Sequence, residues 1–340
     1  MIKESNVRAA VPVTILTGFL GAGKTTLLNR ILTSEHGLRV AVLVNDFGSI
    51  NVDAELVVGV EDDMISLANG CVCCEVRDDL VEAIDAVIER PEPVDYVLLE
   101  ASGVADPGSI FVTFTDPKYR ERIRIDGITC VVDAEQIFND EDPEPISLLK
   151  LRQIGFADML ILNKTDLASD DQVARVRAWI DSRLNRVRIV EASHCEVPLE
   201  ILLGAGRFDG IDQAPHASST QNHHDSDFSR WSFQTEEPLS LDALREMVKR
   251  QLPSGVYRCK GLIHSVDCPE HRSVLQIVGR RADVTLDRPW KADVPLTRIV
   301  AIGAANQLDS EQLQSLFEGC IAGRETESTE SLPGVRTVRI

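Results

Sequence analysis

A glycine-rich run from Gly18 to Thr26 has the residue types and spacing of a phosphate-binding loop. It reads Gly-Phe-Leu-Gly-Ala-Gly-Lys-Thr-Thr, which matches the pattern G-x-x-x-x-G-K-[ST]. Glycines let successive backbone N–H groups turn inward around phosphate oxygens, and a helix that starts there adds partial positive charge. Lys24 is expected to reach the β- and γ-phosphates, and the Thr25 hydroxyl to bind Mg²⁺. The predicted nucleotide contacts in this phosphate loop are Gly18, Gly21, Ala22, Gly23, Lys24, Thr25 and Thr26.

A second polar motif, Asn163-Lys164-Thr-Asp166, follows the apolar run Asp158–Leu162. An aspartate can accept two hydrogen bonds from guanine, one from the ring N–H and one from the exocyclic amine. Adenine offers no such pair of donors, and a buried carboxylate left unpaired costs more than a missed apolar contact. The motif therefore predicts that the nucleotide is GTP or GDP. Its predicted base-side contacts are Asn163, Lys164 and Asp166.

Two further loops follow strand-like runs and carry carboxylates. Glu100 opens Glu-Ala-Ser-Gly103, where it could hold the Mg²⁺ shell while the Gly103 N–H faces the γ-phosphate. Asp46 and Asp53 lie in a polar stretch after the second strand, which suits a loop that orders when the γ-phosphate is present. These two could orient water or touch a metal, or they could be solvated turn residues. Lys24, Glu100, Asp46 and Asp53 are the catalytic candidates.

Three thiols gather in Cys71-Val-Cys73-Cys74, between a predicted strand and a predicted helix. Thiolates at the start of a helix have a lowered pKa, which makes them good metal ligands and good nucleophiles. Zn²⁺ or a similar ion takes tetrahedral sulfur and nitrogen ligands, so a fourth ligand must come from elsewhere. A transition-metal site is the favoured interpretation, while a redox dithiol and a buried structural trio remain open.

The remaining histidines and cysteines give weaker signals. A polar segment contains His216, His223 and His224, which could capture metal loosely or have no ligand at all. Cys130 lies in an apolar strand and is expected in the core. We assign no role to the isolated cysteines Cys195, Cys259, Cys268 and Cys320.

The elements that must position these motifs alternate between strand-like and helical patterns. Such alternation predicts an α/β fold: a mostly parallel P-loop sheet with helices on both faces and its ligand at the carboxyl ends of the strands. Predicted strands are Val13–Leu16, Val40–Val44, Met64–Leu67, Tyr96–Leu99, Gly127–Val132, Met159–Leu162 and Arg188–Val190. Predicted helices include Thr26–Leu32, Leu80–Ile88 and Gln172–Leu184.

A change in composition divides the chain. We predict a P-loop GTPase domain at 1–207, a polar linker at 208–229 that contains the histidines, a smaller C-terminal α+β domain at 230–325 and a tail at 326–340. The C-terminal domain is expected to hold strands at 231–235, 258–266, 273–278 and 297–302, with helices at 239–252 and 310–321.

The net charge, the apolar runs and the cysteines of the whole chain limit the possible functions. The net charge of −19 argues against nucleic acid as a partner, because phosphates would be repelled. No apolar run is long enough to cross a membrane, and the N-terminus has no apolar signal core, so we expect a cytoplasmic protein. Thiols in a reducing compartment favour metal or redox chemistry over structural disulfides.

The motifs together resemble the CobW-type GTPases, which are metal-handling P-loop proteins. The phosphate loop, Asn-Asp-Phe-Gly48, Asn-Gly-Cys-Val-Cys-Cys74, Glu-Ala-Ser-Gly103 and Asn-Lys-Thr-Asp166 carry the likeness, and Arg258–Ile263 with Val274–Gly279 resembles the CobW C-terminal domain. The resemblance implies a GTP-dependent metallochaperone that uses Mg²⁺-GTP, binds Zn²⁺ or Co²⁺ at the cysteines, and hands the metal to a client metalloprotein or a cobalamin-pathway enzyme.

The chain departs from the family pattern at Asn45-Asp46, where relatives usually carry Asn-Glu, which puts a ligand role for Asp46 in question. The linker is also less rich in histidine than in some relatives. Rival hypotheses are a nucleotide-gated metal store or sensor, a thiol redox switch and, more weakly, a kinase or ligase. We expect slow intrinsic hydrolysis, because the sequence offers no clear arginine finger. The oligomeric state stays open.

Overall fold

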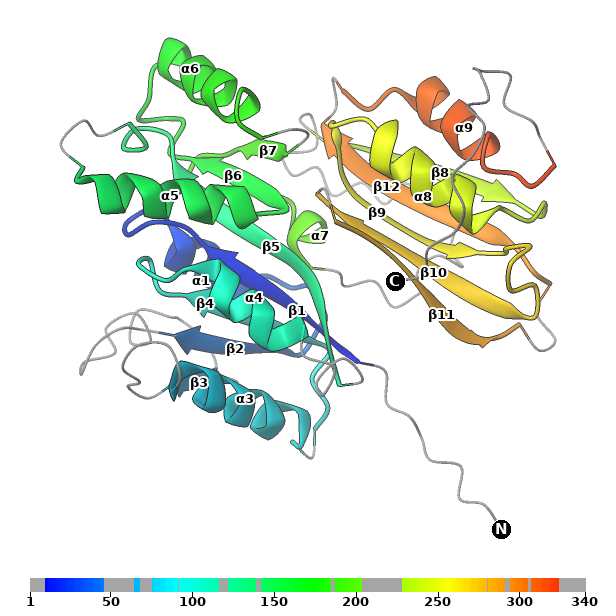
Figure 1. The fold of residues 1–340 in the computed structure, drawn as a ribbon, viewed down its shortest axis with the longest axis horizontal. Coiled ribbons are helices and arrows are strands. Elements are labelled where there is room, and N and C mark those ends of the chain that lie inside the picture. The colour runs from blue at the N-terminus through cyan, green and yellow to red at the C-terminus, as the bar shows by residue number, and fades with distance from the viewer. Residues whose placement is uncertain are drawn as a thin grey trace, which may run out of the picture.

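Two β-sheets form the frame of the molecule (Figure 1). The computed structural model describes residues 10–45, 64–67, 75–90, 92–115, 122–138, 142–184, 187–203, 228–279, 281–290, 294–304 and 307–323. Within these ranges the first sheet has seven parallel strands in the order β3-β2-β4-β1-β5-β6-β7. The strands are β1 (Val11–Thr17), β2 (Val40–Asn45), β3 (Met64–Leu67), β4 (Tyr96–Ala101), β5 (Ile123–Asp133), β6 (Met159–Asn163) and β7 (Arg188–Glu191).

Helices cover both faces of this sheet, as predicted for the α/β class. Leu28 and Ile31 of α1 pack on one face, and Leu80 and Ile84 of α3 pack on the other. Because both faces are covered, strands such as β4 and β6 are buried along their whole length. The helices are α1 (Lys24–Thr33), α3 (Glu75–Ile88), α4 (Pro107–Thr115), α5 (Glu144–Phe156), α6 (Asp170–Asp181) and α7 (Leu199–Leu202). None of the described helices is long and apolar enough to span a membrane.

The second sheet is antiparallel, with strand order β11-β10-β9-β12-β8, and α8 and α9 pack on it (Figure 1). Trp231, Phe233 and Phe317 stack in its core, with ring centroids 5.3–6.0 Å apart. The predicted α+β architecture of the C-terminal part is therefore present. Its elements are β8 (Phe228–Thr235), α8 (Leu241–Arg250), β9 (Val256–Ile263), β10 (His271–Val278), β11 (Arg281–Pro289), β12 (Thr297–Ala304) and α9 (Ser310–Glu318).

Several boundaries differ from those the sequence predicted. The last two residues of the predicted linker, Phe228 and Ser229, belong to β8, because Phe228 pairs with Ala304 and its ring packs 6.1 Å from that of Tyr257. β5 begins four residues earlier than predicted, and β11 was not predicted at all. β11 is mostly exposed and polar, so its strand conformation comes from pairing with β10 rather than from burial. The predicted tail and the rest of the predicted linker lie outside the described residues.

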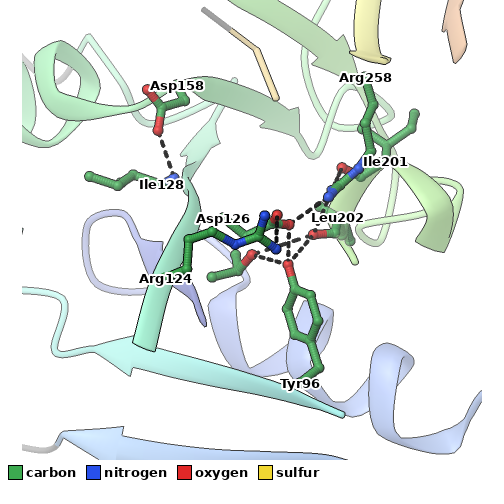
Figure 2. A network of polar contacts seen from close by, with 9 residues as sticks. Tyr96, Arg124, Asp126, Ile128, Asp158, Ile201, Leu202 and Arg258 are labelled. Atoms are coloured by element: carbon green, nitrogen blue, oxygen red, sulfur yellow. Dashed lines mark hydrogen bonds and ion pairs between the residues drawn. The ribbon is translucent and has the colours of Figure 1, made fainter. Parts of the chain in front are cut away.

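Polar contacts join the two sheets through β5, as Figure 2 shows. The Arg258 guanidinium of β9 meets the carboxylate of Asp126, to which the Tyr96 hydroxyl also donates a hydrogen bond. Asp158 receives a hydrogen bond from the backbone of Ile128 and an ion pair from Arg281, 2.8 Å away. The second sheet is thus attached to β4 and β5, the two neighbours of β1, which leads into the phosphate loop.

Candidate functional site

The phosphate loop runs from the end of β1 to the start of α1 and depends on glycine. Gly18 and Gly23 have φ values of +136° and +112°, which side chains rarely tolerate. A Cβ at Gly18 would lie 2.2 Å from the carbonyl oxygen of Val131, and one at Gly23 would lie 2.5 Å from Nδ2 of Asn163. Gly23 caps α1 with no side-chain hydrogen bond, so no capping side chain occupies the anion-attracting end of the helix.

Lys24 and Thr25 start α1 at the carboxyl edge of the sheet. The Lys24 side chain is largely buried, and its Nζ donates to the carbonyl of Phe19 at 3.4 Å. The Thr25 hydroxyl donates to Oε1 of Glu100, 3.3 Å away at the end of β4. The fold therefore brings together the two residues that the sequence assigned to Mg²⁺, although they lie far apart in the chain.

Asn163 links three segments around this loop. Its Nδ2 donates to the carbonyl of Ala22 at 2.9 Å, and its Oδ1 accepts the backbone N–H of Cys195 at 2.8 Å. The Cys195 thiol in turn contacts the carbonyl of Gly23 at 3.3 Å. Asn163 thus fastens the phosphate loop to the segment that follows β7.

Lys164 and Asp166 extend from the same edge of the sheet. Lys164 has a φ of +62° and its Nζ lies 2.5 Å from Oδ2 of Asp133. A hydrogen bond from the Ser193 side chain, aided by the charge of His194 when it is protonated, holds the pKa of Asp166 below its ordinary value. Asp166 is partly exposed, so its carboxylate is ionised and open to a ligand.

The other predicted site residues fall into two groups. Gly103 lies in the loop after β4, packed against Leu20 of the phosphate loop. Asp46, Asp53, Cys71, Cys73, Cys74, His216, His223 and His224 lie outside the described residues. Within the described part of the chain, no group of three or more His, Cys, Asp or Glu side chains is arranged to hold a metal ion.

Comparison with known protein families settles the relationship that these motifs indicate. The model of the CobW/HypB/UreG nucleotide-binding domain matches residues 12–191, and that of the cobalamin synthesis protein cobW C-terminal domain matches residues 228–321. The chain belongs to the CobW family. This CobW-family protein is a P-loop GTPase that binds GTP and GDP.

Relatives of this CobW-family GTPase resemble it along most of their length. The "Zinc chaperone CobW" of Pseudomonas aeruginosa is 35% identical, and the similarity covers 92% of each chain. The "Zinc chaperone YjiA" of Escherichia coli is 30% identical, over 91% of this chain and 98% of YjiA. A crystal structure of Zn(II)-bound YjiA GTPase from E. coli aligns over 92% of this chain and 99% of that one, with 27% identity and a TM-score of 0.44.

The structure adds residues to the site that sequence reasoning missed. Ser193, His194 and Cys195 follow β7, and the last two have left-handed backbone conformations. Their position after a predicted strand, at the same edge as the other motifs, was a usable signal. Cys130, by contrast, is a buried core residue of β5, as expected. Gln153 of α5 also reaches the site, and no local sequence pattern marks it.

Proposed function

We propose that this CobW-family GTPase is a GTP-dependent metallochaperone whose cargo is a transition-metal ion, with Zn²⁺ the first candidate. The observation that carries the GTP-dependent part is the contact between Thr25 and Glu100 beside a glycine-shaped phosphate loop. The metal part is supported by the sequence Cys71-Val-Cys73-Cys74 and by two relatives named zinc chaperones at 35% and 30% identity.

The residues present fit Mg²⁺-GTP. Mg²⁺ prefers hard oxygen ligands, and the Thr25 hydroxyl and Glu100 carboxylate offer them side by side at the start of α1. When bound there, Mg²⁺ would neutralise charge on the β- and γ-phosphate oxygens. In this proposal Thr25 binds the ion and Glu100 orients its water shell.

The protein's own groups bind the phosphates and the base of the nucleotide. The Lys24 ammonium leaves the Phe19 carbonyl to pair with the β- and γ-phosphates, and the backbone amides of residues 21–26 hold phosphate oxygens. Asp166 accepts the two guanine N–H groups, while Asn163 keeps the phosphate loop in place. The Gly103 N–H contacts the γ-phosphate, so the loop after β4 distinguishes GTP from GDP.

Coupling to the metal requires that the cysteine site differ between the nucleotide states. We propose that the GTP state has high metal affinity and that hydrolysis lowers it, so that the metal passes to a client protein. Co²⁺ is a second candidate cargo, because thiolate ligands accept both ions.

A metal titration tests this function. Zn²⁺ and Co²⁺ are titrated into the purified, reduced protein in competition with a chelator, with Mg²⁺ and a non-hydrolysable GTP analogue, with Mg²⁺-GDP, or without nucleotide. The expected result is higher affinity with the GTP analogue, lost in Cys73→Ser. Affinity that ignores the nucleotide would instead indicate a metal store, and absence of binding would indicate a thiol switch.

A further inference from the structure

Gln153 connects α5 to the loop that follows β4. Its side chain is 1% exposed, and its Nε2 donates hydrogen bonds to the carbonyl oxygens of Gly103, at 3.0 Å, and Ala105, at 3.2 Å. Because both partners are acceptors, the NH₂ group of the amide must face the loop. The backbone N–H of Ala105 also donates a hydrogen bond to the carbonyl of Ser102, so residues 102–105 form a closed turn, called the Gly103 turn below.

The same turn is packed against the phosphate loop on its other side. A Cβ at Gly103 would lie 2.8 Å from the backbone nitrogen of Leu20 and 2.6 Å from its Cδ2. Only glycine fits between the turn and Leu20 at this distance. Gly103 therefore lies between α5 and Leu20 of the phosphate loop.

A second contact from α5 reaches the phosphate loop itself. Lys150 lies one turn before Gln153 on the same side of the helix, and its Nζ is 4.9 Å from the ring centroid of Phe19. Lys150 is fixed by an ion pair with Asp142 at 2.5 Å and a hydrogen bond to the carbonyl of Gln136 at 3.1 Å. One face of α5 thus contacts both the phosphate loop and the Gly103 turn.

The acceptor half of the Gln153 amide receives no hydrogen bond from the described part of the chain. Its Oε1 is buried and has no hydrogen-bond partner among the residues that the structure describes. Gln153 lines a cavity that is shared with Phe19, Leu20 and Lys150. A buried acceptor without a partner is rare enough to need an explanation. Among the described residues, the amide therefore makes its hydrogen bonds to the Gly103 turn and orients its NH₂ group toward that turn.

We propose that Gln153 is the positioning residue that holds the Gly103 turn where its N–H meets the γ-phosphate. The inference rests on the proposed role of Gly103 as the γ-phosphate contact. Two hydrogen bonds from a buried side chain order the turn before the nucleotide arrives. The free energy of GTP binding then does not include the entropy cost of ordering this turn. GDP lacks the γ-phosphate and does not depend on the turn. Gln153 therefore sets the preference of the enzyme for GTP over GDP.

The test compares two substitutions in the full-length protein. Gln153→Met keeps the length of the side chain and removes both donors, and Gln153→Glu replaces the NH₂ with an oxygen that faces two carbonyls. Equilibrium titrations with Mg²⁺ measure the Kd of GDP and of a non-hydrolysable GTP analogue. We expect affinity for the analogue to fall about ten-fold in both variants, while that for GDP changes by less than about two-fold.

Three controls separate the possible outcomes. Gln314→Leu on α9, an exposed position whose side chain donates a hydrogen bond to Glu318, should leave both constants unchanged. Lys24→Ala tests the proposed phosphate site: if it kept normal affinity for both nucleotides, the proposed function itself would fail. Thermal unfolding of the Gln153 variants reports folding. Equal losses for GDP and the analogue, or no loss for either, would overturn the positioning role even if the melting temperature fell.

Discussion

Arg258 and Asp126 form a buried ion pair between the two sheets. Nη2 of Arg258 lies 2.5 Å from Oδ2 of Asp126, and the two side chains are 4% and 1% exposed (Figure 2). Burial by itself raises the pKa of Asp126, but the charge of Arg258 and the hydrogen bond from Tyr96 bring it below its ordinary value. The same guanidinium donates to the carbonyl of Ile201 at 3.1 Å. One pair of residues thus joins β5, β9 and α7.

Replacing the carboxylate of this pair should destabilise the protein. Asp126→Asn would leave the Arg258 cation buried without a counter-charge, which typically lowers the free energy of unfolding by roughly 3–5 kcal/mol. Urea denaturation measures the change. The matched control is Asp242→Asn, which breaks the exposed pair with Arg245 and should change stability by less than about 0.5 kcal/mol. Equal effects in the two variants would contradict a structural role for the buried pair.

Gly23→Ala should damage the phosphate loop. The added methyl group would be 2.5 Å from Nδ2 of Asn163, at a φ of +112°. We expect stability to fall by roughly 1–3 kcal/mol and GDP affinity to fall at least about ten-fold. Gly37→Ala is the control, because Gly37 has a φ of +69° and no atom of the described residues lies within 4 Å of its Cβ position. It should lose some stability and keep its nucleotide affinity. GDP binding unaltered in Gly23→Ala would refute the assignment.

Asp166→Asn should weaken recognition of guanine. Asparagine has one acceptor oxygen and an NH₂ donor in place of the two carboxylate oxygens, so it cannot pair with both guanine N–H groups. GDP affinity should therefore fall at least about ten-fold, while weak ADP binding stays unchanged. Competition titrations with GDP and ADP measure the preference. Because the pKa of Asp166 is lowered, its carboxylate remains ionised in mildly acidic buffer, so the wild-type preference for GDP should persist there. A variant that kept the full preference would show that another group reads the base.

Lys260 should make stability depend on pH. Burial, followed by repulsion from Arg258, lowers the pKa of Lys260 to about 7, although Asp126 opposes the shift. The unfolded chain, in which lysine titrates near pH ~10.4, binds more protons between about pH 7 and pH 10, so this residue makes stability rise with pH across that window. Lys260→Met should raise the urea midpoint at pH 7 and flatten that rise.

The control for this experiment is Lys249→Met, at an exposed position on α8. It should alter neither the midpoint nor its pH dependence. If Lys260→Met lowered the urea midpoint at pH 7, the Lys260 ammonium would be stabilising the folded protein, which would contradict the prediction.

Some elements could not be predicted because their sequences give a misleading or weak local signal. α4 is rich in β-branched and aromatic residues that favour strands, yet it is helical because Ile110 and Phe114 pack against the sheet. α5 buries the polar residues Lys150 and Gln153 beside Ile154, so its apolar periodicity is weak. In α4 tertiary packing overrides local preference, and in α5 it supplies the order that the weak pattern does not predict.

By itself, the sequence determined the class of fold and the P-loop GTPase family, and it marked the phosphate loop and the motif Asn163–Asp166 as the predicted nucleotide contacts. These depend on short-range spacing: glycines at positive φ, a lysine and threonine at the start of a helix, and polar residues directly after apolar strands. Tertiary structure alone decided which distant groups meet there. Asn163 with Ala22, Gln153 with Gly103, and Arg258 with Asp126 are 141, 50 and 132 residues apart. Such contacts follow from strand order and register, which no local pattern encodes.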